Sequence, residues 1–323
     1  MWVFTLLLCV ALAFAAKSYH KFDIEDAEEL FEEFIKNHNK HYADEDEKAW
    51  RFIIFKHNLE LINRQNAKSD SAAFDINMFT DLTPEEFIII YTGYRGLNAS
   101  NCDSQEPNFK TAPDAFDWRE QNKVTGIRNQ ERCGACWAFG AVGNLESQYA
   151  IKYNQILDFS EQQLVDCDKN SFGCSGTQDL AYPFMYWMEH GPMLEEDYKY
   201  EGSDGTCRAD DSKAKAKISG CVAYSTNDEE ALKKALHDVG PLAIAIDATS
   251  IMHYNHGVMD GCTCNSINHA VLLVGYGTEK DIPFWVIKNS WGADWGEDGF
   301  FKVKRGVNSC CMMDDTMVTA VLA

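Results

Sequence analysis

Three separated segments carry side chains that together could cleave a peptide bond. The first contains Gln130 and Cys136, the second His269 and the third Asn289. Amide hydrolysis needs a nucleophile, a proton carrier and donors that stabilise the oxyanion, and these residue types can supply all three. A Cys-x-x-Cys pair alone, here Cys133 and Cys136, could instead be redox-active or half of a zinc site. The later histidine and asparagine favour hydrolysis.

The expected roles follow from the chemistry of each group. A free thiol is mostly protonated at neutral pH. Apolar spacing predicts a helix over 136–153, so Cys136 would sit at its N-terminus, where the helix dipole and a nearby imidazolium favour the thiolate. His269 would accept the thiol proton and return it to the leaving amine. Asn289 would orient the imidazole, and the Gln130 amide with the Cys136 backbone N–H would hold the oxyanion.

Composition excludes several classes of partner. The chain has 323 residues, 46% of them hydrophobic and 24% charged, which are values typical of a globular protein with about two domains. The formal net charge is −21. Neither nucleic acid nor an anionic membrane surface is therefore an expected partner.

The N-terminus predicts the compartment. Residues 6–16 are apolar and end in an A-x-A-like site, and this run is too short to span a bilayer. We expect a secretory signal peptide over 1–16, no membrane anchor, and disulfides among the cysteines that follow. Asn98 begins an N-glycosylation sequon.

The helices and strands that must position these catalytic side chains are not distributed evenly along the chain. Residues 23–66 are predicted to be helical, a further helix should start at Thr83-Pro84, and the polar segment 98–111 indicates a linker. After Pro113 helical signals give way to strands. One side of the second predicted helix combines charge, aromatic and amide groups: Glu47, Arg51, Phe55, Asn58, Ile62 and Asn66. The strands are predicted over 242–246, 270–276, 284–287 and 299–304. This order indicates an α+β enzyme with two lobes.

These motifs resemble the papain-like cysteine peptidases. The resemblance rests on residues 130–137, 268–271 and 288–292, and the mixed helical stripe with Asn77, Phe79 and Asp81 is similar to the propeptide of the cathepsin-L-like branch. Residues 160–164 and 295–301 look most like the members that baculoviruses encode. The resemblance implies a papain-like two-lobed fold, with a helical left lobe, a β-barrel-like right lobe and the cleft between them. It also implies three segments: a signal peptide (1–16), a helical inhibitory propeptide (17–112) and a mature peptidase (113–323).

The same resemblance implies the function and partners. We expect a cysteine endopeptidase made as a secreted zymogen, with protein and peptide substrates, its own propeptide as inhibitor, no cofactor or metal, and a monomeric state. Retention in the endoplasmic reticulum as zymogen, then action in a lysosome-like compartment or outside dead host cells, would serve degradation of host tissue late in infection. The alternatives are a catalytically inactive papain-like binding protein and a propeptide-type protease inhibitor.

Substrate binding is also assigned by resemblance. Ala245 and Ile267 would line the S2 pocket and Asp315 would form its floor, where a carboxylate would admit arginine besides hydrophobic P2 residues. Alternatively, Asp315 is a surface residue of a solvated C-terminal segment. Thr177 stands where the family usually has glycine. The full expected set is Gly176, Thr177, Ala245, Ile267, Trp291 and Asp315.

The resemblance also pairs six cysteines as disulfides: Cys133 with Cys174, Cys167 with Cys207, and Cys262 with Cys310. Four cysteines are left without an assignment: Cys102, Cys221, Cys264 and Cys311. Of these, Cys264 and Cys311 could pair with each other or exchange partners with the third pair. A zinc site on Cys262, Cys264, His253 and His256 is an alternative with irregular spacing.

Overall fold

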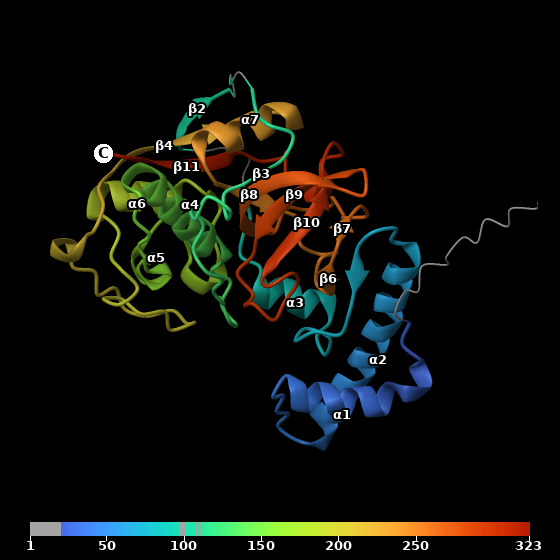
Figure 1. The fold of residues 1–323 in the computed structure, drawn as a ribbon. Helices are drawn as coiled ribbons and strands as arrows, with labels where there is room; N and C mark the ends of the chain where they lie inside the picture. Colours follow the sequence, from blue (N-terminus) through green and yellow to red (C-terminus); the bar gives the residue numbers. More distant parts are fainter. Residues whose placement is uncertain (1–20, 97–100, 107–108, 110) are drawn as a thin grey trace, which may run out of the picture.

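The computed structural model describes residues 21–96, 101–106, 109 and 111–323 (Figure 1). The signal peptide predicted over 1–16 and the sequon at Asn98 lie outside the described residues. The helices are α1 (Ala27–Asn37), α2 (Glu45–Lys68), α3 (Pro84–Tyr91), α4 (Cys136–Tyr153), α5 (Glu161–Cys167), α6 (Tyr182–His190) and α7 (Glu229–Val239). Short 3-10 turns add η1 (Ile24–Asp26), η2 (Gly173–Ser175), η3 (Asp211–Lys213) and η4 (Ser309–Cys311). No helix in this described part is long and apolar enough to cross a membrane.

The strands build one large mixed sheet and one small ribbon. In the large sheet the neighbours run β2-β4-β11-β5-β8-β9-β10-β7, β3 pairs with β8, and the ribbon joins β1 to β6. Their bounds are β1 (Ala73–Phe74), β2 (Asp103–Gln105), β3 (Phe116–Asp117), β4 (Ile218–Tyr224), β5 (Leu242–Ile246), β6 (Tyr254–His256), β7 (Val258–Met259), β8 (His269–Glu279), β9 (Ile282–Lys288), β10 (Phe300–Lys304) and β11 (Met317–Leu322). The predicted strands coincide with β5, β8, β9 and β10.

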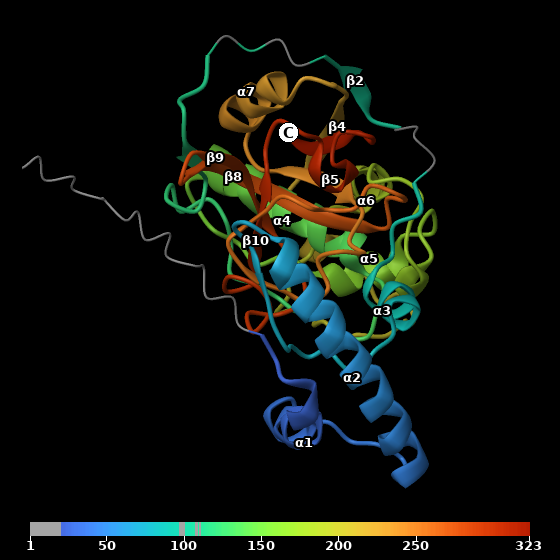
Figure 2. The same cartoon turned by 90° about the vertical axis from the view of Figure 1, so that its right-hand side faces the viewer.

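The N-terminal helices form a unit that projects from the body, as both views show (Figure 1, Figure 2). The single helical stretch predicted over 23–66 is wrong at 38–44, where the chain leaves the helix. Asn39 takes a positive φ of 48° there, and the Asp44 side chain accepts the Glu47 backbone N–H as the N-cap of α2. The predicted start of α3 is confirmed, with a capping box between Thr83 and Glu86.

The part of the chain that follows residue 111 places helices beside the sheet. Helices α4, α5 and α6 gather on one side, and strands β8, β9 and β10 lie on the other (Figure 1). The central helix α4 packs along β8. It is buried along most of its length because it is apolar on nearly every face. Its N-terminal residue, Cys136, is thereby fixed beside Ala270 of β8, whose backbone N–H lies 3.4 Å from the cysteine sulfur.

The polar segment predicted as a linker over 98–111 contains a strand. Residues 103–105 form β2, which pairs in parallel with β4. The prediction of an unstructured linker is therefore wrong for these residues. Composition gave no sign of the strand because its side chains are exposed, and its pairing depends on a distant strand.

Candidate active site

Cys136 is held at the N-terminus of α4. The side chain is fully buried, and the Ala270 backbone N–H lies 3.4 Å from its sulfur. The preceding turn is fixed by the Cys133–Cys174 disulfide and by a 2.9 Å hydrogen bond from the Gly134 N–H to the Cys174 carbonyl. Among the described residues, Cys136 is the cysteine that keeps a free thiol. The helix dipole points its positive end at this thiol.

His269 and Asn289 are joined across two neighbouring strands. His269 begins β8, and Asn289 follows the last residue of β9. His269 Nε2 lies 2.8 Å from Asn289 Oδ1, which also accepts the Ser290 backbone N–H at 2.9 Å. Because that atom already accepts a backbone proton it is the amide oxygen, so Nε2 carries the imidazole proton. Nδ1 has no hydrogen-bond partner and is left as the basic nitrogen.

Trp291 covers this pair. Its ring stacks on the imidazole of His269 with 4.6 Å between centroids and 27° between planes. Trp291 is fully buried, and its flanking aromatic neighbours Phe79 and Phe87 come from the propeptide. The indole therefore shields the His269–Asn289 hydrogen bond from water on one side.

Gln130 presents its amide to the same cleft. Its Nε2 donates to the Cys133 carbonyl at 2.8 Å and to the Tyr91 carbonyl of the propeptide at 3.2 Å. Its Oε1 accepts the Ser290 hydroxyl at 2.6 Å, which fixes the amide orientation. Sequence reasoning missed Ser290, because a serine beside the Asn289 motif carries no signal of its own. The Tyr91 carbonyl of the propeptide thus already accepts a hydrogen bond from Gln130 Nε2, the donor that is expected to face the oxyanion.

Burial sets the protonation of the two central groups. It raises the pKa of the Cys136 thiol to about 11, although backbone N–H groups, beginning with that of Ala270, act in the opposite sense. Burial also lowers the pKa of His269 to about 4, against the opposing effect of the hydrogen bond that the imidazole donates to Asn289. Both shifts favour the neutral thiol and the neutral imidazole over the thiolate–imidazolium pair while the propeptide covers the site.

The propeptide crosses the cleft as an extended strand after α3. The Thr177 N–H donates to the Gly93 carbonyl at 2.7 Å, and the Arg95 N–H donates to the Thr177 carbonyl at 2.9 Å. These bonds make a parallel bridge between Tyr94 and Thr177. A Cβ on Gly93 would overlap the Gly134 carbonyl, and one on Gly176 would overlap the Gly93 carbonyl, so both close approaches require glycine.

Tyr94 occupies a buried pocket beside the cleft. It is 4% exposed, and its hydroxyl donates to Asp315 Oδ2. Its pKa is raised, first by burial and then by the Asp315 carboxylate. Ala245 and Ile267 belong to the same hydrophobic cluster as Tyr94. Asp315 is 9% exposed, so its alternative placement on a solvated surface is wrong.

Gly93 and Tyr94 together show the direction in which the propeptide crosses the cleft. The Gly93 N–H faces the Cys136 thiol, and the next residue, Tyr94, enters the pocket. In a substrate whose P2 residue fills that pocket, the P1 residue at the thiol comes after P2 in the chain. The propeptide runs opposite to the direction that such a substrate would take. Sequence reasoning missed Tyr94, since its position depends on this reversed path.

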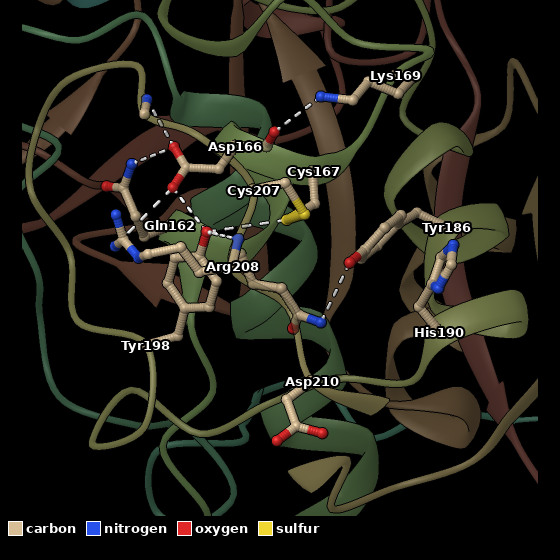
Figure 3. The surroundings of a disulfide bond; sticks show 12 residues. Gln162, Asp166, Cys167, Lys169, Tyr186, His190, Tyr198, Cys207, Arg208 and Asp210 are labelled. Carbon is tan, nitrogen blue, oxygen red and sulfur yellow. Dashed lines mark hydrogen bonds and ion pairs between the residues drawn. A yellow bond between two sulfur atoms is a disulfide. The ribbon is translucent and has the colours of Figure 1, made fainter. Parts of the chain in front are cut away.

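The motif over 160–164 is structural. It forms the N-cap and first turn of α5, and Asp166 in the same helix accepts the Gln162 amide at 2.8 Å and the Tyr198 hydroxyl at 2.7 Å. The Cys167–Cys207 disulfide fastens the loop over residues 198–208 to the same helix, as Figure 3 shows. The loop is thereby tied to α5 by covalent and hydrogen bonds.

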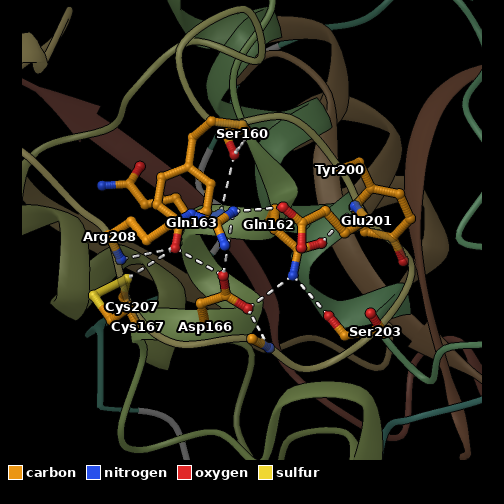
Figure 4. Close-up of polar contacts among 12 residues, drawn as sticks. Ser160, Gln162, Gln163, Asp166, Cys167, Tyr200, Glu201, Ser203, Cys207 and Arg208 are labelled. Carbon is orange, nitrogen blue, oxygen red and sulfur yellow. Dashed lines mark hydrogen bonds and ion pairs between the residues drawn. A yellow bond between two sulfur atoms is a disulfide. The ribbon is translucent and has the colours of Figure 1, made fainter.

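That loop supports the oxyanion side of the cleft. Gln162 Nε2 also donates to the Ser203 carbonyl at 2.8 Å, and its Oε1 accepts the Glu201 N–H at 2.8 Å (Figure 4). The neighbouring Tyr200 hydroxyl donates to the Gln130 backbone carbonyl at 2.8 Å. The α5 network therefore fixes the backbone of Gln130 from behind.

The described residues form five disulfides. Cys133–Cys174, Cys167–Cys207 and Cys262–Cys310 are the pairs that the resemblance implied, and Cys102–Cys221 and Cys264–Cys311 take up the four cysteines left over. The alternative zinc site is wrong, because the thiols of Cys262 and Cys264 are both in disulfides. His253, its third member, is buried with neither ring nitrogen hydrogen-bonded.

The comparisons with known proteins agree with this site and fold. Residues 112–321 match the papain family of cysteine proteases, and residues 31–87 match the cathepsin propeptide inhibitor domain (I29). The chain belongs to the papain family and is a cysteine protease with its inhibitory propeptide attached. Its α+β fold is that of a papain-like proform.

Among curated relatives, the chain is similar to viral cathepsins. It is 44% identical to that of Adoxophyes honmai nucleopolyhedrovirus, over 100% of this chain and 99% of the relative. It is 45% identical to that of Choristoneura fumiferana nuclear polyhedrosis virus, over 94% and 95% of the two chains. Among solved structures, digestive procathepsin L2 of Tenebrio molitor superposes with a TM-score of 0.85 at 35% identity, over 92% of this chain and 100% of that one.

Proposed function

We propose that the mature enzyme cleaves peptide bonds through an acyl-enzyme on Cys136. His269 Nδ1 takes the thiol proton, and the thiolate attacks the scissile carbonyl carbon. The resulting oxyanion accepts the Gln130 amide and the Cys136 backbone N–H. When the C–N bond breaks, the imidazolium gives its proton to the leaving amine, and water then hydrolyses the thioester with the same base.

One observation carries this proposal most strongly: the imidazole of His269 is held in a single tautomer. Asn289 fixes the proton on Nε2, which leaves Nδ1 as the free base. The next residue, Ala270, has its backbone N–H 3.4 Å from the sulfur of Cys136. The alternative, a catalytically inactive papain-like binding protein, gives no reason for such an arrangement. The inhibitor alternative is disfavoured because the chain carries the catalytic half as well as the propeptide.

Replacing Gln130 tests the oxyanion role. Gln130→Ala in the activated enzyme is expected to lower kcat by about 10²–10³-fold with a much smaller change in KM, because the donor acts mainly on charge that develops in the transition state. Ser290→Ala is the matched control. It removes only the hydroxyl that orients the amide and should cost less. A kcat within twofold of wild type in Gln130→Ala would exclude the assigned role.

We also propose that the pocket filled by Tyr94 is the S2 subsite. Its apolar walls suit phenylalanine or tyrosine at P2, and the Asp315 carboxylate suits arginine through a charge-assisted pair. The Tyr94 hydroxyl on Asp315 supports this proposal, because it shows the carboxylate within reach of an occupant of the pocket.

The Asp315→Ala variant tests the pocket. For substrates with Arg or Phe at P2 and Arg at P1, the Arg-to-Phe ratio of kcat/KM should fall by about 5- to 150-fold, the equivalent of about 1–3 kcal/mol. The exposed neighbour gives the control, since Asp314→Ala should leave the ratio unchanged. An unaltered ratio in Asp315→Ala would show that this carboxylate does not read P2.

We further propose a secretory zymogen, directed by residues 1–16, that is retained in the endoplasmic reticulum. The mature chain would begin near residue 113 or upstream of it, and would act in a lysosome-like compartment or outside dead cells. The relatives in nucleopolyhedroviruses support host-tissue protein as the substrate class. A monomer is expected. Glycosylation at Asn98 is part of the same proposal.

A further inference from the structure

The segment that follows the inhibitory strand is bonded covalently to the catalytic domain. Cys102 forms a disulfide with Cys221 of β4, with 5.0 Å between their Cα atoms, a separation typical of disulfides. Cys221 is 4% exposed and Cys102 is 9% exposed, so the bond is shielded from solvent thiols. It joins residues 119 positions apart in the sequence.

Backbone pairing continues from this disulfide. Asp103, Ser104 and Gln105 pair in parallel with residues 222–224 of β4, so β2 forms the end of the large sheet beyond β4. Both views place β2 beside β4, away from α1 and α2 (Figure 1, Figure 2). Without β2, the backbone groups on this edge of β4 would be unpaired, a position that sheets usually protect.

Side chains hold the two flanks of the segment. Before the disulfide, the Asn101 backbone N–H and Nδ2 donate to Asp179 Oδ2 at 3.1 and 2.8 Å. Asp179 is 4% exposed, and its other oxygen accepts the Ala181 N–H at 2.8 Å. After the strand, the ring of Phe109 packs edge-on against Tyr224 with 6.0 Å between centroids. Residues 101–106 thus pair with β4 as a strand of the catalytic domain. Residues 92–95 instead cover the cleft, as an inhibitor does.

We propose that residues 101–106 are a permanent part of the catalytic domain, anchored by the Cys102–Cys221 disulfide, and that the chain must be cut on the N-terminal side of Cys102 to release the inhibitor. A cut only at the predicted boundary near residue 113 would leave the whole propeptide attached through this bond. A tethered inhibitor acts at an effective concentration of about 1 mM, so it would keep the cleft occupied. Release from that state would require a thiol reductant. The inference rests on the proposed activation by propeptide removal.

The Cys102–Cys221 tether can be detected without any peptidase activity. In a Cys136→Ser zymogen, a recognition sequence for a foreign protease is inserted after Thr111 and then cut. Without reductant the denatured product should keep its full-length mass, and with reductant it should separate into two chains. The matched control adds Cys102→Ser and Cys221→Ser, and should separate under both conditions. Separation of the first protein without reductant would overturn the proposal.

A second measurement uses the unmodified zymogen, in case the double replacement fails to fold. The zymogen is processed at acid pH, alkylated with iodoacetamide and digested without reduction. A peptide that joins Cys102 to Cys221 is the expected product. A processed enzyme that lacks Cys102, or whose Cys221 carries the alkyl group, would contradict the proposal. Absence of processing would instead count against the proposed activation, and the foreign-protease experiment would still report the tether.

Discussion

Acidification is expected to raise the activity of the purified zymogen by at least about 100-fold. Processing should be slow at pH 7 and rapid between about pH 4 and 5.5, the range in which carboxyl groups titrate. The measurement is the rate of peptide hydrolysis, with gel analysis of the chain, after incubation across this pH range. A zymogen that is equally active at pH 7 without cleavage would contradict the expectation.

Protonation of His269 supplies much of this pH dependence. Under the propeptide, burial lowers its pKa from 6.5 to about 4. A group whose pKa is lowered in the closed state stabilises that state fully above pH 6.5, and the stabilisation is lost as the pH falls towards 4. If opening of the cleft returns the pKa of His269 to its ordinary value of 6.5, the loss amounts to about 3 kcal/mol by pH 4, which changes the ratio of open to closed zymogen by about 100-fold.

An ion pair in the propeptide adds to the effect. Arg51 Nη1 lies 2.7 Å from Glu86 Oε2. Burial alone would raise the Glu86 pKa, but the hydrogen bonds from Arg51 and from the Thr83 N–H outweigh it and lower the pKa. Stability from this pair is therefore present above the usual pKa of a glutamate and is lost as the pH falls through the lowered value. Acid weakens the fold of the inhibitor as well as its docking.

The Glu86→Gln variant isolates this contribution. Loss of a charge-assisted bond should weaken the propeptide by about 1.5–3 kcal/mol, so its zymogen should process faster at pH 7 and over a range shifted to higher pH. The adjacent exposed carboxylate provides the control, because Glu85→Gln should leave the profile unchanged. Identical profiles for the two variants would exclude a role for the Arg51–Glu86 pair.

The sequence predicted where Cys136 and His269 lie in the fold because their residue types are diagnostic and stand at the ends of elements. Cys136 opens α4, which spans the predicted range, and His269 opens β8. Buried apolar strands such as Leu242–Ile246 were predicted to the residue, since a continuous apolar run bounded by turn residues leaves few alternatives. Such features are determined by residues that are close together in the sequence.

Other features depend on distant partners and could not be predicted. Cysteine spacing alone does not determine which residues pair, so Cys102–Cys221 and the strand beside it were missed. The place of Tyr94 in the cleft follows from a parallel bridge to Thr177, which no local pattern indicates. The protonation of Cys136 and His269 also depends on burial, which favours the neutral thiol and imidazole over the ionic pair that the sequence alone predicted.

Replacement of Cys136 should abolish catalysis. Cys136→Ser in the activated enzyme is expected to lower kcat/KM by at least about 1000-fold, because a serine hydroxyl gives almost no alkoxide and the site is arranged for a thiol. The change is close to isosteric, so the fold should persist, which circular dichroism can verify. Retention of more than a few per cent of kcat/KM would be incompatible with Cys136 as the nucleophile.

Covalent labelling gives the most direct test of the central role of Cys136. The zymogen at pH 7, the activated enzyme and a denatured sample are each treated with iodoacetamide, and the adducts are mapped by mass spectrometry alongside residual activity. Cys136 is fully buried under the propeptide, so we predict no adduct there in the zymogen. In the activated enzyme we predict one adduct, on Cys136, that forms in step with the loss of activity. Inactivation without an adduct on Cys136, or full activity with Cys136 alkylated, would contradict its assignment as the nucleophile.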